Sequence, residues 1–221
     1  MKKIEVWDAP QRVLHILLAA GFAGAWLTAE SERWRALHVA LGYLVAVAAV
    51  LRILWGFAGT RHARFAAFVR GPRAASGYLR ALARGRAPHH TGHNPAGGLA
   101  ILGLLGLALL VTASGWVALQ DGFGESIADA HEALAGAMAA LVGLHLAGVL
   151  VGSLAHREFL PLSMITGRKR GAPDEAIGNT RPVLGALVLA ICLAFAFAQL
   201  PSPVPAPRLT ASAASFAAAP R

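Results

Sequence analysis

The stretch from residue 130 to residue 153, AHEALAGAMAALVGLHLAGVLVGS, constrains the fold more than any other part of this chain. It is apolar and long enough to cross a bilayer, yet it contains two histidines, His131 and His145. Their spacing of fourteen residues corresponds to about 21 Å of α-helix and nearly four turns, so both imidazoles leave one face at different depths. Ionisable side chains inside a membrane span are costly and usually face a partner within the bundle. The pattern therefore indicates a function for both histidines.

An imidazole at membrane depth commonly ligates a metal or haem iron, or relays protons. A histidine that only packs, hydrogen-bonded to a neighbouring carbonyl, is the alternative, and two histidines in register make it less favourable. A divalent-cation transporter is expected to place carboxylates at membrane depth. The first four predicted spans contain only Glu132, which stands beside His131 at the start of its helix. The same scarcity of carboxylates argues against a proton pump.

Composition places the chain among membrane proteins, because 56% of its 221 residues are hydrophobic and only 14% are charged. The single cysteine, Cys192, excludes an internal disulfide, a covalently attached CxxCH haem and a cysteine-ligated iron–sulfur cluster. Any haem would therefore be held non-covalently by side chains such as histidine. The first apolar run is followed by further ones, so we expect a retained anchor rather than a cleaved signal peptide.

Apolar runs predict five transmembrane helices, and positive charge predicts their orientation. The predicted spans cover residues 13–28, 36–57, 96–119, 130–153 and 182–200. Of the 20 Lys and Arg, 16 fall in residues 1–12, 52–95 and 154–181. By the positive-inside rule these segments and the N-terminus face the cytoplasm at a bacterial inner membrane, and the C-terminus is periplasmic. This distribution explains the net charge of +9 without a polyanionic partner, so membrane lipid and no nucleic acid is expected as a partner.

The longest polar connection, residues 58–95, contains seven Arg and neither Asp nor Glu. From Pro72 its apolar residues recur at near-helical spacing. This predicts an amphipathic helix on the membrane surface, attracted to anionic headgroups, with a solvated basic loop as the alternative. Arg52 and Trp55, at the end of the second span, are expected to lie at the membrane surface.

Orientation pairs the histidines of the spans by depth. His15 and His145 are expected near the cytoplasmic face, whereas His38 and His131 are expected near the outer face. Two bis-histidine sites stacked across a four-helix bundle suit electron transfer through two b-type haems, because two axial histidines fill both open iron positions. Gly42, one turn beyond His38, would let a flat ligand approach the backbone. We expect an all-α integral membrane four-helix bundle binding two haems, plus a fifth transmembrane helix.

Several motifs give the chain a resemblance to the prokaryotic cytochrome b561 group, which includes the b-type cytochrome subunits of membrane-bound nickel–iron hydrogenases. They are VWDAPQRVLH at 6–15, RILWGFAGTRHARFAAFV at 52–69, GHNPAGG at 92–98, HEALA at 131–135, GLH at 143–145 and HREFLPLSMITGRKR at 156–170. The resemblance implies that residues 1–170 form a di-haem cytochrome b transmembrane domain. It leaves residues 171–200 as a linker and fifth helix, which braces the bundle or tethers a partner, and 201–221 as a disordered periplasmic tail.

The resemblance also implies specific residues and partners. The axial ligands would be His15, His38, His131 and His145, and the positions near the cytoplasmic surface that contact propionates or quinone would be Arg12, Arg61, Arg64, His93 and Asn94. The remaining histidines, His62, His89, His90 and His156, are expected at the surface. Electrons would pass between a periplasmic redox protein, such as a c-type cytochrome or hydrogenase-like enzyme, and the quinone pool.

Two other functions stay open from the sequence. The haem core could act directly on a small substrate such as superoxide, with quinone as the second partner, and a cationic outer funnel would favour that reaction. The outer linkers are instead mixed or acidic, with Asp121, Glu125 and Asp129 in the second one. The third function is a histidine-containing metal transporter.

Overall fold

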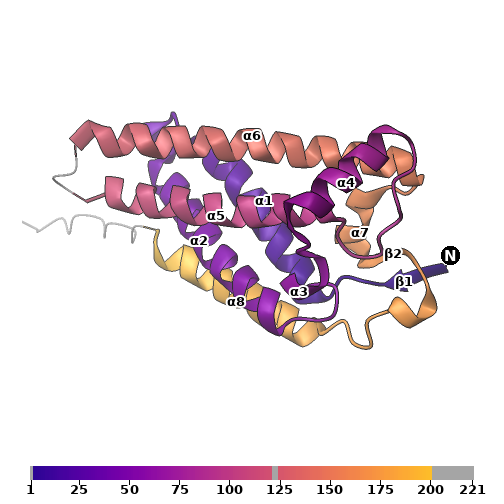
Figure 1. Ribbon diagram of the computed structural model, residues 1–221. Helices are drawn as coiled ribbons and strands as arrows, with labels where there is room; N and C mark the ends of the chain where they lie inside the picture. The colour runs from indigo at the N-terminus through magenta and orange to yellow at the C-terminus, as the bar shows by residue number, and fades with distance from the viewer. Residues whose placement is uncertain (1, 121–123, 201–221) are drawn as a thin grey trace, which may run out of the picture.

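The computed structural model describes residues 2–120 and 124–200, and most of these residues are helical, as the all-α prediction requires (Figure 1). The long helices in this part are α1 (Ala9–Thr28), α2 (Arg35–Ala58), α5 (Pro95–Ala118), α6 (Gly124–His156) and α8 (Pro182–Ala198). They lie side by side as an elongated bundle (Figure 1). Asp121 and the predicted tail, residues 201–221, lie outside the described residues.

Three stretches of the described chain are long and apolar enough to cross a membrane: Glu32–Ala58, Pro95–Ala118 and Glu125–His156. Helix α8 is apolar but shorter, with 17 residues. Helix α1 has 20 residues, but its first turn contains Gln11 and Arg12. The three stretches include the second, third and fourth predicted spans.

Helices α1, α2 and α8 pack together through an apolar cluster that includes Leu14, Ala48 and Cys192. Helices α5 and α6 form a second pair, which meets α2 through residues such as Ala49 and Met138. Helix α6 therefore joins the bundle mainly through α5, and it makes no comparable contact with α1 or α2. His131 of α6 faces His38 of α2, a helix against which α6 does not pack closely.

Short elements gather at one end of the bundle (Figure 1). They include α3 (Phe65–Phe68), α4 (Gly71–Ala83), α7 (Leu160–Thr166) and the strands β1 (Lys2–Glu5) and β2 (Arg168–Gly171). The strands pair antiparallel with Ile4 opposite Lys169, and the 3-10 turns Glu32–Trp34 and Pro173–Glu175 complete the described elements. Helix α4 forms where the sequence predicts an amphipathic helix, with Tyr78 buried and Arg80 exposed.

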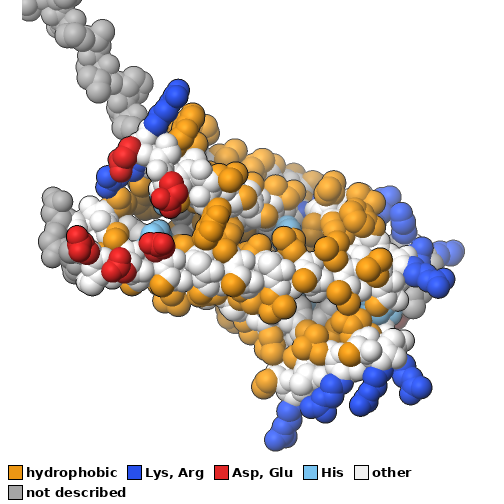
Figure 2. All heavy atoms as spheres, turned by 90° about the horizontal axis from the view of Figure 1, so that it is seen from above, with side chains coloured by type: hydrophobic (Ala, Val, Ile, Leu, Met, Phe, Trp, Pro, Cys, Tyr) orange, Lys and Arg blue, Asp and Glu red, His pale blue; other side chains and the backbone are white. Residues whose placement is uncertain are grey.

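Charge is distributed unevenly along the bundle. Figure 2 shows most Lys and Arg at one end, Asp and Glu at the opposite end, and hydrophobic side chains over the surface between them. Exposed apolar residues on α6, such as Leu144, Leu150 and Leu154, belong to that band. Such a band between two polar ends is the surface expected of a bundle that lies in a bilayer.

A buried carboxylate joins the start of α1 to the end of α2. Asp8 is fully buried, caps α1 by accepting a hydrogen bond from the backbone of Gln11 (2.8 Å), and accepts another from Thr60 Oγ1 (2.6 Å). The indole of Trp55 also donates to it, at 3.1 Å. The prediction of Arg52 at the membrane surface is wrong, because Arg52 is only 3% exposed. The membrane-surface position of Trp55 stays a prediction.

Candidate functional site: paired histidines between helices

His38 and His131 face each other across the end of the bundle that carries the acidic side chains. His38 comes from α2 and His131 from α6, and their ring centroids lie 6.2 Å apart with the ring planes at 84°. The two residues are far apart in sequence, and neither helix packs closely on the other. The rings therefore meet between the helix pairs α1–α2 and α5–α6.

Both rings are fixed through Nδ1. His38 Nδ1 lies 2.8 Å from the carbonyl oxygen of Ala25, and His131 Nδ1 lies 3.0 Å from that of Val111. A carbonyl oxygen only accepts, so Nδ1 carries the proton on each ring, and Nε2 keeps its lone pair for a metal. The hydroxyl of Ser114, 3.1 Å from His131 Nδ1, adds a second polar contact.

The spacing of the two rings fits two axial ligands of one iron. Metal–imidazole bonds of about 2 Å on opposite sides of an ion leave ring centroids roughly 6 Å apart. The observed separation of 6.2 Å agrees with this value. Two imidazoles without a third protein ligand match the donor set of a bis-histidine haem.

Two glycines shape the surroundings of this pair. A Cβ atom at Gly115 of α5 would lie 2.9 Å from His131 Cε1, so the absence of a side chain there lets α5 pass close to the ring. A Cβ at Gly42, one turn beyond His38, would meet nothing within 4 Å. The backbone at Gly42 is therefore accessible to a flat ligand, as the sequence predicts.

His15 and His145 lie toward the basic end. His15 comes from α1 and His145 from α6. The Nδ1 atom of His15 is buried and has no hydrogen-bond partner within the described residues. Within the described residues the rings of His15 and His145 are not in contact, in contrast to those of His38 and His131.

His93 and Arg52 stand beside the second pair. The ring of His93 packs on Trp7 and Phe68, with centroids at 4.5 and 4.7 Å. Burial, followed by the charges of Arg52, Lys169 and both histidines of the pair, holds the pKa of His93 well below its usual value. Sequence reasoning missed Arg52 as a site residue, although an arginine inside an apolar helix is the kind of residue that marks function.

Three buried nitrogens in this region lack a partner within the described residues: His15 Nδ1, His93 Nδ1 and Arg52 Nη1. Buried polar groups in native proteins are almost always hydrogen-bonded. Arg52 donates only from Nη2, to the carbonyl of Ala63 at 3.3 Å, and its guanidinium lies over the ring of Phe65. The region thus suits a ligand that brings acceptors or negative charge, such as haem propionates.

Other predicted site residues make contacts that hold the basic end together. Arg12 donates to the carbonyl oxygens of Met164 and Ile165 in α7. Arg61 donates to the carbonyl of Asp174 at 3.0 Å, and Asn94 caps α5 by accepting from Gly97 at 2.8 Å. Arg64 is exposed at the start of α3.

The expectation that His62 lies at the surface is wrong. His62 is 7% exposed, and its Nε2 lies 2.7 Å from the carbonyl oxygen of Glu175. Within residues 2–120 and 124–200 no group of three or more His, Cys, Asp or Glu is arranged to hold a metal ion.

Residues 6–167 match a sequence model of the family described as prokaryotic cytochrome b561. The matched region contains all four paired histidines and most of the 221 residues, and it ends before α8. No curated protein and no solved structure matches the chain.

Proposed function

This chain belongs to the prokaryotic cytochrome b561 family, and we propose that it moves electrons across the membrane through two b-type haems, each held by one histidine pair. Family membership makes it a multi-pass membrane protein of haem-dependent electron transfer. Haem iron, when bound, supplies reversible one-electron chemistry. The chain positions that chemistry and sets its surroundings.

The pair formed by His38 and His131 carries the proposal. Its centroid separation of 6.2 Å and the hydrogen bonds on both Nδ1 atoms support its assignment as the two axial ligands of one haem. Such hydrogen bonds orient the rings and raise the basicity of Nε2. Because both iron positions would be filled by protein, the site favours electron transfer over binding of a substrate to the metal.

The second site rests on His15 and His145, with Arg52 and His93 as neighbours. Partnerless nitrogens on three of these residues support ligation and propionate binding at the basic end. We assign the predicted quinone contact to this end as well. His93, whose ring packs on Trp7 and Phe68, is the residue that we assign to this contact.

Charge supports the proposed sidedness. The basic end, with β1, β2 and α7, would face the cytoplasm of a bacterial inner membrane, and the acidic end would face the periplasm. Glu125, Asp129 and Glu132 at the start of α6 suit a basic periplasmic redox protein. The rate of reduction by a basic soluble cytochrome is expected to fall as ionic strength rises, and a rate insensitive to salt contradicts docking on these residues.

Direct reaction with superoxide is less favoured than transfer to a redox protein. A substrate anion is drawn by cationic surroundings, whereas the acidic end would repel it. Among the described residues only Arg33 and Arg35 bring positive charge to that end, and Arg35 lies 3.8 Å from Glu32.

Electron flux across a sealed membrane tests the proposal. Full-length protein would be reconstituted into liposomes that contain ferricyanide, with a membrane-impermeant reductant outside. Wild type is expected to pass electrons, His38→Ala to lower the flux by about tenfold or more, and His89→Asn, a histidine replacement outside the pairs, to leave it unchanged. Wild-type flux no greater than that of protein-free liposomes would overturn the proposal.

A further inference from the structure

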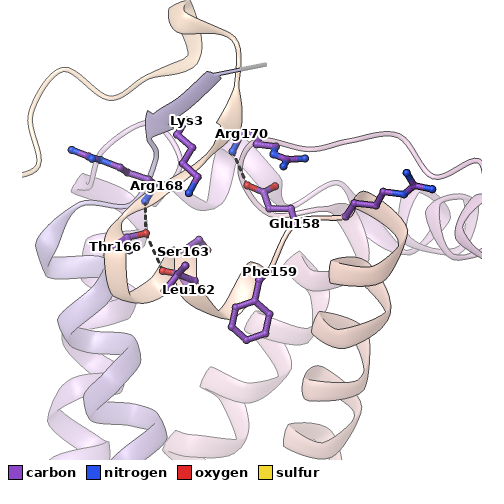
Figure 3. A pocket seen from close by; sticks show the side chains of 9 residues that line it. Lys3, Glu158, Phe159, Leu162, Ser163, Thr166, Arg168 and Arg170 are labelled. Carbon is purple, nitrogen blue, oxygen red and sulfur yellow. Dashed lines mark hydrogen bonds between the residues drawn. The ribbon is translucent and has the colours of Figure 1, made fainter.

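A cavity of about 150 Å³ lies at the basic end, between α7, the two-stranded sheet and the turn after α6 (Figure 3). None of its lining residues belongs to a histidine pair. Four of them are cationic: Lys3, Arg157, Arg168 and Arg170. The cavity is therefore a separate feature of the fold with a strong positive charge.

Only part of this charge is balanced by carboxylates. Arg168 pairs with Glu5, with Nε 2.6 Å from Oε1. Glu158, which also lines the cavity, is occupied by the backbone N–H of Arg170 (2.7 Å) and by His89 (3.5 Å). Within the described residues no carboxylate lies within ion-pair distance of the other three cations, Lys3, Arg157 and Arg170.

The backbone of Arg157, one of the cations that line the cavity, is strained. Its φ is +51°, in the left-handed region that costs a residue with a side chain about 1 kcal/mol. Glycine or asparagine would occupy this turn more easily. Arg181 has a similar φ of +52°. At Arg157 the strained residue also lines the cavity, which points to a use for its side chain.

The other side of the cavity is apolar and open. Of the apolar residues that line it, Phe159 is 66% exposed and Leu162 is 42% exposed. In Figure 3 Phe159 extends toward the long helices, away from Lys3 and Arg170. The cavity thus has cations at its outer side and apolar surface on the side of the membrane band.

We propose that this cavity binds the phosphate headgroup of an anionic phospholipid, whose acyl chains lie along Phe159 and Leu162. Arginine and lysine are the side chains that bind phosphate best, and basic pockets at the cytoplasmic ends of transmembrane helices accept anionic headgroups. A soluble anion would use the cations but leave the exposed apolar side chains in water. The amphipathic lining therefore selects a lipid.

Binding would join elements that are distant in sequence. Lys3 belongs to β1, Arg170 to β2 and Arg157 to the turn that ends α6. A headgroup bound in this cavity would link the basic end of α6 to the sheet. Because a lipid that binds only the folded protein stabilises it, binding is expected to raise the unfolding temperature of the whole protein.

The test uses full-length protein in a neutral detergent. Thermal unfolding and native mass spectrometry would be measured with phosphatidylglycerol, with phosphatidylcholine, and with inorganic phosphate at matched ionic strength. The cavity variant is Lys3→Gln with Arg157→Asn, since asparagine tolerates the left-handed turn. The control is Lys2→Gln with Arg86→Gln, which removes the same charge from exposed positions outside both the cavity and α4. Lys3→Gln alone, an exposed position, serves if the double variant unfolds.

We expect phosphatidylglycerol, and neither other addition, to stabilise wild type and to stay bound in the mass spectrometer. At about 1 kcal/mol for each basic residue, the apparent affinity falls roughly fivefold in Lys3→Gln and roughly 25-fold in the cavity variant, while the control keeps wild-type affinity. Equal loss in the control would show that general surface charge, not the cavity, attracts the lipid. Equal protection by inorganic phosphate, or by phosphatidylcholine, would also overturn the proposal.

Discussion

Replacing Gly115 by alanine disturbs the outer histidine pair without removing a ligand. The new Cβ would lie 2.9 Å from His131 Cε1 and 3.2 Å from Nδ1, whereas ordinary contacts begin at 3.4 Å. The imidazole must therefore move by about 0.5 Å, and metal–ligand distances tolerate only about 0.2 Å. The perturbation is small for the fold but large for coordination.

The ring has little freedom to absorb this movement. Its Nδ1 is held by the carbonyl of Val111 and the hydroxyl of Ser114, so displacement weakens these hydrogen bonds or the bond to iron. A lost hydrogen bond costs about 1 kcal/mol, which the better helix propensity of alanine offsets by about 1 kcal/mol. We expect nearly unchanged unfolding of the protein, with damage confined to one haem.

Gly106→Ala, on the same helix, is the matched control, because a Cβ there meets nothing within 4 Å. The measurements are the haem-to-protein ratio, a redox titration and the low-spin electron paramagnetic resonance signals. Gly115→Ala is expected to shift or abolish one of the two haem signals and leave the other, and Gly106→Ala to match wild type. If both variants match wild type in both signals, the position of His131 at an iron is refuted.

Three further predictions concern the basic end and the orientation. Asp8→Ala removes the α1 cap and leaves the indole of Trp55 and the hydroxyl of Thr60 unpaired, so the free energy of unfolding should fall by about 2–4 kcal/mol. Asp8→Asn should fall between wild type and Asp8→Ala, and an unchanged thermal midpoint in Asp8→Ala would contradict this prediction. Burial lowers the pKa of the Lys169 ammonium group from 10.5 to about 8 in the folded protein. Between these two pH values the unfolded chain still binds the proton that the folded protein has lost, so the free energy of unfolding rises with pH. The thermal midpoint should therefore rise with pH in wild type and in the control Lys2→Met, but not in Lys169→Met. Identical pH profiles of the midpoint in the two variants would count against the burial of Lys169. A reporter active only in the periplasm and fused after Arg221 should be active, and an inactive fusion would overturn α8 as a span.

Hydrophobic patterning was enough to predict the long helices. The third span, predicted at 96–119, is α5 at Pro95–Ala118, and the second, predicted at 36–57, is α2 at Arg35–Ala58. Apolar runs with Pro or Gly near their ends carry this information locally. The meeting of His38 and His131 also follows from the sequence, because helix direction converts position in the chain into depth.

The basic end could not be predicted in the same way. Lys2–Glu5 and Arg168–Gly171 are short, polar and widely separated, so neither segment alone indicates a strand. Their pairing depends on the tertiary structure that brings them together. Arg52 was misplaced for a related reason: its position near a helix end suggests a surface side chain, but Ala63 and Phe65 of the following segment cover it.

Haem content of the paired-histidine variants tests the central claim most directly. The measurement is the haem-to-protein ratio with a redox titration, for wild type and for two double variants, His15→Ala/His145→Ala and His38→Ala/His131→Ala. Wild type should bind two haems, and each double variant should keep one, with a midpoint potential close to one of the original two. The two retained potentials should differ, because each double variant removes a different site. A double variant that keeps two low-spin haems, or a wild type that binds none, contradicts the assignment of these histidines.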